Sequence, residues 1–487
     1  MKHKSKKDLM LLFLIFMGAL LIRAYQLSIF EFKNDQYFAI MLGNQTRNLH
    51  FMITHGMVSG VGVNNPPFFL YLMGLLTFFT NNPFYITLFF FYINAAALSL
   101  VFIYFYRTLP KPFSIITSCL LAISPAFTIY SNIIWAQCLL PFLMILFNIC
   151  MYKFIESRKQ AYFLISVILA ALAAQFHMTG FFLFPLILIL LIIRWKDIDK
   201  KSIVLATLIL FIIFIPYLIN LFAEKEIYKL LSYGTPLKRH LPWRAFVEHL
   251  RMASFDFFSH YFRHDFNSVL KASAGFLRFI LYPLTWILSA LFIFGFIEYI
   301  KLSIRLRKFF DTAVKTTENY PLPFQISGFM IVVITLFYFI FNVRTPTHYF
   351  IVFFPAYSII TGFSAFKIWK WVWGKTVVLS GIISTVVLLL FILSFLDKAG
   401  GHPYEYGLTY KKTQALANEV RKLLPEGFCP DLKINFIGKG KSDSEAVTYL
   451  INEQLGCLDK KQLVPIQVNI EWDDNLMQYA CSVSKIR

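Results

Sequence analysis

The sequence predicts an all-α membrane protein that crosses the bilayer many times and ends in a small α/β domain. Hydrophobic residues make up 58% of the 487 residues and charged residues only 15%, which is too little polar composition for a soluble chain of this length. Apolar runs of nearly membrane-spanning length recur along the chain, for example 181–193 and 203–214. The segment after residue 396 has instead the pattern of a soluble piece.

The apolar runs predict about eleven transmembrane helices. They cover 9–27, 83–106, 114–130, 135–152, 161–176, 180–193, 203–221, 274–300, 324–341, 349–365 and 377–395. The stretch 66–79 is apolar but short, and we interpret it as a re-entrant or juxtamembrane helix in the first outer loop. The basic N-terminus precedes a long apolar run without a small-residue cleavage site, which predicts an uncleaved first helix.

The distribution of Lys and Arg predicts the orientation. If 66–79 does not span and the N-terminus is cytoplasmic, basic residues gather in the inner loops, as the positive-inside rule requires. These residues are Arg107, Lys111, Lys153, Arg158, Lys159, Arg194, Lys196, Lys200, Lys201, Arg305, Arg307, Lys308, Lys367, Lys370 and Lys375. The protein is thus expected in the plasma or inner membrane, with its C-terminal domain extracytoplasmic. The net charge of +20 reflects this topology, and we expect no nucleic-acid partner.

The orientation places three long segments outside: 30–65, 223–271 and everything after residue 396. We therefore divide the chain into a transmembrane domain, 1–396, and an extracytoplasmic domain, 397–487. The second domain is predicted to contain helix 412–424, strand 433–437, helix 444–454 and strand 465–471. Its three cysteines (Cys429, Cys457 and Cys481) allow one disulfide at most, with one thiol left over.

The first outer loop contains the most informative polar residues. Glu31 and Asp35 are four residues apart, so on a helix they would share one face at the membrane edge. A carboxylate in that place can act as a general base. Arg47 and His55 follow in the same loop. A solvated loop with incidental charges is the alternative interpretation, and the spacing alone does not exclude it.

Two motifs in this chain resemble those of the C-type membrane glycosyltransferases, in particular the protein O-mannosyltransferase and aminoarabinose-transferase type (family 39). The stretch 64–71, Asn-Asn-Pro-Pro-Phe-Phe-Leu-Tyr, resembles the family's (K/H/N)-P-P-L-x-Y element, with Phe68 where Leu is usual and Tyr71 one place late. The stretch 344–349, Arg-Thr-Pro-Thr-His-Tyr, followed by Pro355, resembles the late R-x-x-H-Y…P element with one extra residue. The resemblance covers roughly 9–396.

The resemblance implies transfer of a sugar from a polyprenyl-phosphate carrier on the outer face, with Asp35 as the catalytic base. The family usually has Asp-Glu in the first loop, whereas this chain has Asp35-Gln36, so the role of a second acid is in doubt. Arg344, and less surely Arg263, would hold the donor phosphate. The complete set of expected substrate-binding residues is Glu31, Arg47, His55, Asn65, His177, Arg263, His264, Arg344, His348 and Tyr349.

The large outer loop, 223–271, is rich in Arg and His. These cations can capture a lipid-linked phosphate or attract anionic lipid headgroups, and the sequence leaves both open. His260 and His264 have the i, i+4 spacing of a metal pair, with Asp256 and Asp265 nearby. No second ligand cluster accompanies them, so we assign no metal ligand and expect no cofactor, although a divalent metal is left open.

We therefore expect a hexosyl- or pentosyltransferase that moves a sugar from a polyprenyl-phosphate donor to an acceptor hydroxyl with inversion. Its partners would be this donor, a lipid, glycan or protein acceptor, and membrane lipids. One alternative is a multi-span transporter or flippase for lipid or polysaccharide, but such sites need polar residues at mid-membrane, which these spans nearly lack. Another alternative is an enzyme like the O-antigen ligases or polymerases, against which the placement of Asp35 and Asn65 argues.

Overall fold

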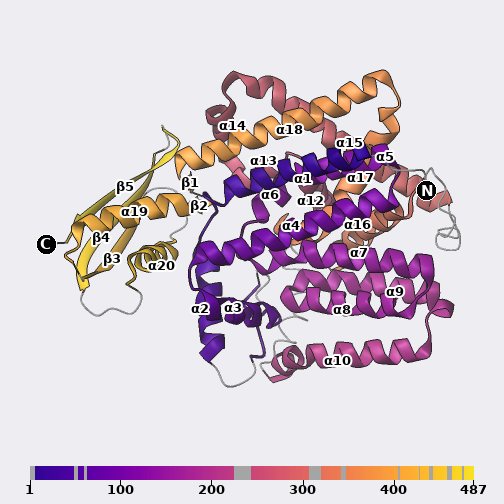
Figure 1. The fold of residues 1–487 in the computed structure, drawn as a ribbon, viewed down its shortest axis with the longest axis horizontal. Helices are drawn as coiled ribbons and strands as arrows, with labels where there is room; N and C mark the ends of the chain where they lie inside the picture. Colours follow the sequence, from indigo (N-terminus) through magenta and orange to yellow (C-terminus); the bar gives the residue numbers. More distant parts are fainter. Residues whose placement is uncertain are drawn as a thin grey trace.

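The computed structural model describes residues 6–48, 53–59, 63–223, 243–305, 320–341, 347–403, 406–426, 428–437, 443–457, 463–473 and 476–486. Long helices lie side by side in a bundle, and a small sheet domain formed by the C-terminal segment lies at one end of it (Figure 1). We call this end of the bundle the domain end. The opposite end lies near the N-terminus.

Each of the predicted spans coincides with helical structure. The bundle elements are α1 (Lys6–Gln26), α4 (Pro83–Thr108), α5 (Lys111–Ala122), α6 (Pro125–Tyr130), η1 (Ala136–Leu139), α7 (Leu140–Ser157), α8 (Gln160–Phe176), η2 (Met178–Phe182), α9 (Leu183–Arg194), η3 (Trp195–Asp197), α10 (Lys200–Ala223), α15 (Arg278–Arg305), α16 (Leu322–Phe341), η6 (Thr347–Phe353), α17 (Phe354–Trp369) and α18 (Val372–Ala399). Within the described residues, seven helical stretches are long and apolar enough to cross a membrane. The all-α membrane fold is confirmed, and the number of eleven spans stays a prediction.

Proline explains why one predicted span is divided. The stretch 114–130 forms two helices, α5 and α6, separated at Ser124-Pro125. Pro125 has no backbone N–H to continue the helix, and the Ser124 side chain instead caps α6 by accepting from the Phe127 N–H. The shorter helices that result bring loop residues to the domain end of the bundle.

The loop between α1 and α4 contains two helices, α2 (Asn34–Asn48) and α3 (Phe68–Phe79). In Figure 1, α2 runs across the direction of the long helices at the domain end. The two helices approach so closely that a Cβ on Gly43 would lie 2.8 Å from the Cβ of Met73. Glycine is therefore needed at this contact, which fixes the two helices against each other.

The second large loop contains the short helices α12 (Trp243–Ala253), α13 (Phe257–Phe262), η4 (Arg263–Asp265), α14 (Phe266–Ala274) and η5 (Gly275–Leu277). Their buried aromatic residues join the main core of the bundle, so this loop is a packed layer rather than a solvated linker. Phe257, Phe258 and Phe262 are fully buried there.

The C-terminal domain contains the four predicted elements and one more strand. They are α19 (Tyr410–Leu423), β3 (Cys429–Ile437), α20 (Ser444–Leu455), β4 (Leu463–Asp473) and β5 (Gln478–Lys485), preceded by the short pair β1 (Gly401–His402) and β2 (Gly407–Leu408). The sheet order is β3-β4-β5, with β3 parallel and β5 antiparallel to β4. A disulfide joins Cys429 to Cys457, and Cys481 is free. Since α18 runs on to Ala399, the domain boundary at 396/397 stays a prediction.

Candidate functional site

A polar cavity with a volume of about 420 Å³ lies at the domain end. Five of the residues singled out from the sequence line it: Asp35, Asn65, His177, His348 and Tyr349. They come from four separate segments of the chain. The cavity is also lined by Lys33, Asn34, Met57, Val58, Ser59, Pro66, Phe69, Trp135, Ala136, Gln137, Phe176 and Asp443.

Asn65 connects the first outer loop to the turn after α8. Its backbone pairs with the preceding strand-like segment, because the Gly56 N–H donates to the Asn65 carbonyl (2.6 Å) and the Asn65 N–H donates to the Met57 carbonyl (3.0 Å). The side-chain amide nitrogen donates to the Met57 carbonyl at 3.0 Å, and its oxygen accepts from the Met178 N–H at 3.2 Å. Asn65 therefore holds the Asn-Pro-Pro element against the turn that contains His177.

His177 lies between α8 and η2, where the chain reverses direction at the cavity. Its Nδ1 accepts from the Thr179 N–H at 3.2 Å and lies 3.0 Å from the Thr179 hydroxyl oxygen. Nε2 lies 3.0 Å from the side-chain amide of Gln137. Burial lowers the pKa of His177 to about 3, and His348 adds to the decrease. His177 is thus a neutral hydrogen-bonding group at pH 7 and not a cation.

Aromatic rings form one wall of the cavity. The rings of Trp135 and His348 lie 5.5 Å apart, and those of His177 and Tyr349 lie 5.4 Å apart. Tyr349 is buried, whereas His348 is half-buried. Flat aromatic faces beside amide and carboxylate groups can contact the C–H faces of a sugar ring while the polar groups bind its hydroxyls.

Asp35 lies in the first turn of α2 and is exposed at the cavity. The next residue, Gln36, is fully buried and accepts from the Lys33 N–H at 2.8 Å. Gln36 therefore caps the start of α2 through its side-chain oxygen.

The expectation that Glu31 and Asp35 share one helix face is wrong. Because α2 begins at Asn34, Glu31 precedes the helix and instead forms a β-bridge with Thr409. Glu31 is buried, accepts from the Tyr261 hydroxyl at 2.7 Å and lies 3.4 Å from the Lys33 ammonium. It does not line the cavity.

The other expected residues lie elsewhere. Arg47 is exposed and donates to the Thr77 carbonyl at 3.0 Å, and His55 is exposed beside Thr54. Arg263 and His264 are exposed in η4 and do not line the cavity. Arg344 lies outside the described residues.

His260 and His264 do not lie on one turn of a single helix, because α13 ends at Phe262, between them. His260 is bonded to Arg251, and His264 contacts Asp265. Over the described ranges, no group of three or more His, Cys, Asp or Glu residues is arranged to hold a metal ion.

Residues 64–220 match the family model described as dolichyl-phosphate-mannose-protein mannosyltransferase. The matched segment begins at the Asn-Asn-Pro-Pro element and includes His177. The resemblance to the C-type membrane glycosyltransferases is confirmed. No curated protein matches the chain.

Three solved structures are also similar to the chain at low sequence identity. The archaeal oligosaccharyltransferase AglB from Archaeoglobus fulgidus, in complex with an inhibitory peptide and a dolichol-phosphate, is 12% identical, with 96% of this chain and 70% of that chain covered and a TM-score of 0.46. ArnT from Cupriavidus metallidurans bound to undecaprenyl phosphate is 10% identical, with 95% and 93% covered and a TM-score of 0.47. The apo state of ArnT is 11% identical, with the same coverage and a TM-score of 0.48.

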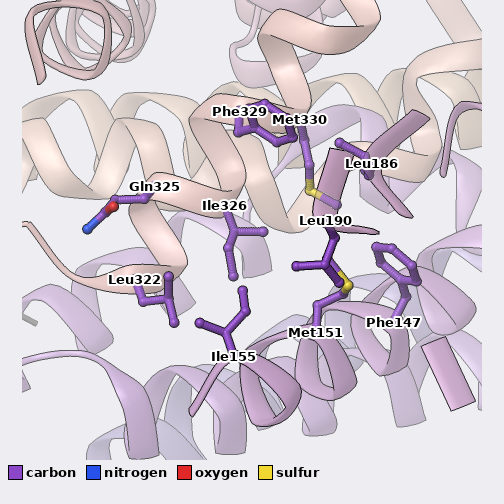
Figure 2. A pocket seen from close by; sticks show the side chains of 10 residues that line it. All are labelled: Phe147, Met151, Ile155, Leu186, Leu190, Leu322, Gln325, Ile326, Phe329 and Met330. Carbon is purple, nitrogen blue, oxygen red and sulfur yellow. The ribbon is translucent and has the colours of Figure 1, made fainter. Parts of the chain in front are cut away.

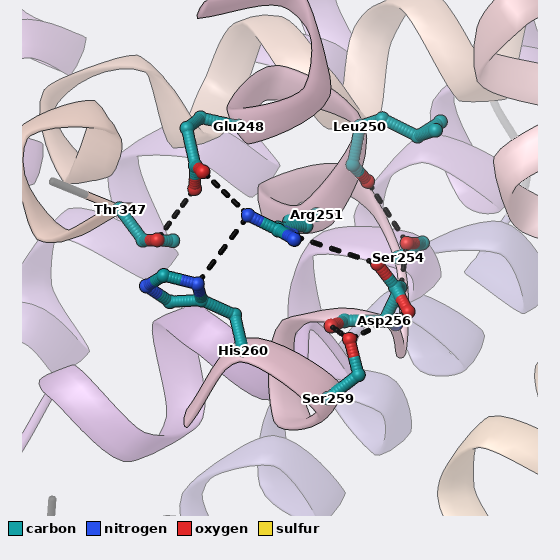
Figure 3. Close-up of polar contacts among 8 residues, drawn as sticks. All are labelled: Glu248, Leu250, Arg251, Ser254, Asp256, Ser259, His260 and Thr347. Atoms are coloured by element: carbon teal, nitrogen blue, oxygen red, sulfur yellow. Dashed lines mark hydrogen bonds and ion pairs between the residues drawn. The ribbon is translucent and has the colours of Figure 1, made fainter. Parts of the chain in front are cut away.

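One polar cluster was not predicted from the sequence. Glu248 on α12 accepts from the Thr347 hydroxyl at 2.5 Å and from Arg251 at 2.6 Å (Figure 3). Arg251 also bonds His260 at 3.3 Å and lies 3.7 Å from Asp256. Thr347 immediately precedes His348 and Tyr349, so the cluster holds the late motif in place. Its signal in the sequence was only the i, i+3 spacing of Glu248 and Arg251, which is common on helices.

A second pocket lies between α7, α9 and α16 and is almost purely apolar (Figure 2). Phe147, Leu190 and Met330 are among the side chains that line it, and Gln325 is its one polar member. Its volume is only about 20 Å³, little more than the space for one water. This pocket is therefore a packing gap between helices and is too small for the tail of a polyprenyl carrier.

Proposed function

We propose that this protein transfers a sugar from a polyprenyl-phosphate donor to an acceptor hydroxyl at the domain end of the bundle. The observation that carries the proposal is the convergence of Asp35, Asn65, His177 and Tyr349 on one cavity from distant parts of the chain. The match of residues 64–220 to a family named for a dolichyl-phosphate-mannose donor supports the donor class. Whether the sugar is a hexose or a pentose is open.

The reaction needs a base for the acceptor proton and a fixed position for both substrates. Asp35 would take the proton of the acceptor hydroxyl while the oxygen of that hydroxyl forms a bond to the anomeric carbon. The bond from that carbon to the phosphate oxygen breaks, and polyprenyl phosphate leaves. A single displacement of this kind inverts the anomeric configuration. The neutral ring of His177 and the side-chain amides of Asn65 and Gln137 would orient the sugar.

A donor panel tests the proposal. Full-length protein in lipid nanodiscs is incubated with undecaprenyl- and dolichyl-phosphate derivatives of several labelled hexoses and pentoses, and with the matching nucleotide sugars. We expect release of polyprenyl phosphate from at least one carrier-linked sugar, and a product of inverted configuration by NMR. Turnover of nucleotide sugars alone, or a product of retained configuration, would overturn the proposal.

A further inference from the structure

The C-terminal domain contributes a carboxylate to the cavity. Asp443, at the start of α20, lines the cavity beside Asp35 although 408 residues separate the two in the sequence (443 − 35). The backbone N–H of Asn34 donates to Asp443 Oδ1 at 3.4 Å. In return, the side-chain oxygen of Asn34 accepts from the Ala446 N–H at 3.1 Å. The first turns of α2 and α20 therefore cap each other.

Further contacts hold α20 in this position along its length. The Tyr449 hydroxyl donates to the Asn81 carbonyl at 2.8 Å, and the Asn82 side chain donates to Glu453 at 2.9 Å. The ring of Tyr449 also packs against those of Phe32 and Tyr37. With α20 held at its start, middle and end, the buried carboxylate of Asp443 is fixed at the cavity.

The charges of this wall select the kind of group that can bind there. Asp35, Asp443 and Lys33 all line the cavity, and the Lys33 ammonium lies 3.4 Å from the buried Glu31 carboxylate. The lining therefore contains two carboxylates, and its lysine is paired with Glu31, which does not line the cavity. Such a wall repels phosphate and carboxylate groups and favours groups that donate hydrogen bonds.

We propose that Asp443 is an acceptor-binding residue and that the acceptor presents uncharged hydroxyl groups of a polyol or sugar to it. This inference rests on the proposed function, because it places the acceptor next to the base Asp35. A polyprenyl tail would lie among the long helices, whereas Asp443 directly precedes α20 in the domain at one end of the bundle (Figure 1). The group within reach of Asp443 is therefore the acceptor and not the donor phosphate.

Saturation-transfer NMR on the full-length protein in nanodiscs tests this inference with three probes: methyl glucoside, glucosamine and glucose 6-phosphate. Asp443→Ser removes the carboxylate but keeps a side chain that caps helices well. Glu445→Gln is the matched control, since it removes one negative charge from the same helical turn at an exposed residue that does not line the cavity. Binding of undecaprenyl phosphate is measured in parallel.

We expect methyl glucoside to bind more tightly than glucose 6-phosphate. Asp443→Ser should weaken the binding of methyl glucoside about tenfold, because one hydrogen bond to a charged group is lost. Glu445→Gln should leave this binding unchanged. Undecaprenyl phosphate should bind all three proteins equally. Equal binding of methyl glucoside to wild type and Asp443→Ser, or preferred binding of glucosamine or glucose 6-phosphate, would overturn the inference. Failure of wild type to bind undecaprenyl phosphate would instead count against the proposed function.

Discussion

The hydroxyl of Tyr261 donates a hydrogen bond of 2.7 Å to Glu31, across 230 positions of the sequence. The backbone of Glu31 also forms a β-bridge with Thr409, so this one buried residue joins the first loop, the large loop and the start of the C-terminal domain. Asp35, four residues later, lines the cavity. The two acids of the first loop thus have different surroundings, which separates a structural role from a catalytic one.

Replacement of Asp35 by Asn should abolish most turnover. The amide keeps the size of the carboxylate but cannot take the acceptor proton, and a positioned base contributes ~10²–10⁴-fold to such a step. Donor binding and expression should persist, since Asp35 is exposed at the cavity surface. Steady-state transfer rates check this expectation. Near-full turnover would mean that the base lies elsewhere.

Replacement of Glu31 by Gln should mainly reduce stability. The amide cannot form the ion pair with Lys33. Loss of this buried charged contact should lower the free energy of unfolding by about 1–3 kcal/mol. We expect a lower thermal unfolding midpoint with turnover largely kept at temperatures where the protein is folded. If Glu31→Gln were as inactive as Asp35→Asn while equally stable to wild type, the separation of roles would be wrong.

The bond between Glu248 and Thr347 should position the late motif. Both Glu248→Ala and Thr347→Val remove it, and a displacement of His348 and Tyr349 of about 1 Å can lower turnover up to ~10²-fold. If Glu248 and Thr347 act only through this bond, turnover by the double variant should be no slower than turnover by the more affected single variant. Additive losses in this double-mutant cycle would show that the two residues act independently.

His402 should make stability depend on pH. Burial lowers its pKa to about 3, with further decreases from His264 and Lys33, whereas the unfolded chain has the ordinary value of 6.5. Between pH 6.5 and about 3 the unfolded state binds the additional proton, so stability should fall as pH decreases through this window. His402→Phe, which can pack against Phe262 and Trp472, should flatten this dependence in thermal unfolding curves. The control is His264→Gln at an exposed residue, and this variant should retain most of the pH dependence of stability.

The domain end should face the extracytoplasmic side. The disulfide of Cys429 and Cys457 favours an oxidising compartment for the C-terminal domain. With the free cysteines replaced, a cysteine at exposed Lys485 should react with a membrane-impermeant maleimide in intact cells. A cysteine at exposed Glu156, near the end of α7 remote from the cavity, should react only after permeabilisation. Labelling of both from the same side would contradict this topology.

The sequence by itself determined the membrane class, the positions of the helices and most elements of the C-terminal domain. Hydrophobic run length and periodicity are local properties, so they can be read without knowing which segments meet. The motifs around Asn65 and His348 likewise identified residues that line the cavity, because they are contiguous in the chain.

Only the tertiary structure decided how these segments meet. Local spacing placed Glu31 and Asp35 on one face, but the caps formed by Gln36 and Asp443 start the helix at Asn34 and leave Glu31 outside it. Nothing near Asp443 in the sequence marks it as a cavity residue, because its significance depends on a contact more than 400 residues away. Burial and charge pairing arise from packing between distant segments, and a single sequence does not encode these contacts in any local pattern.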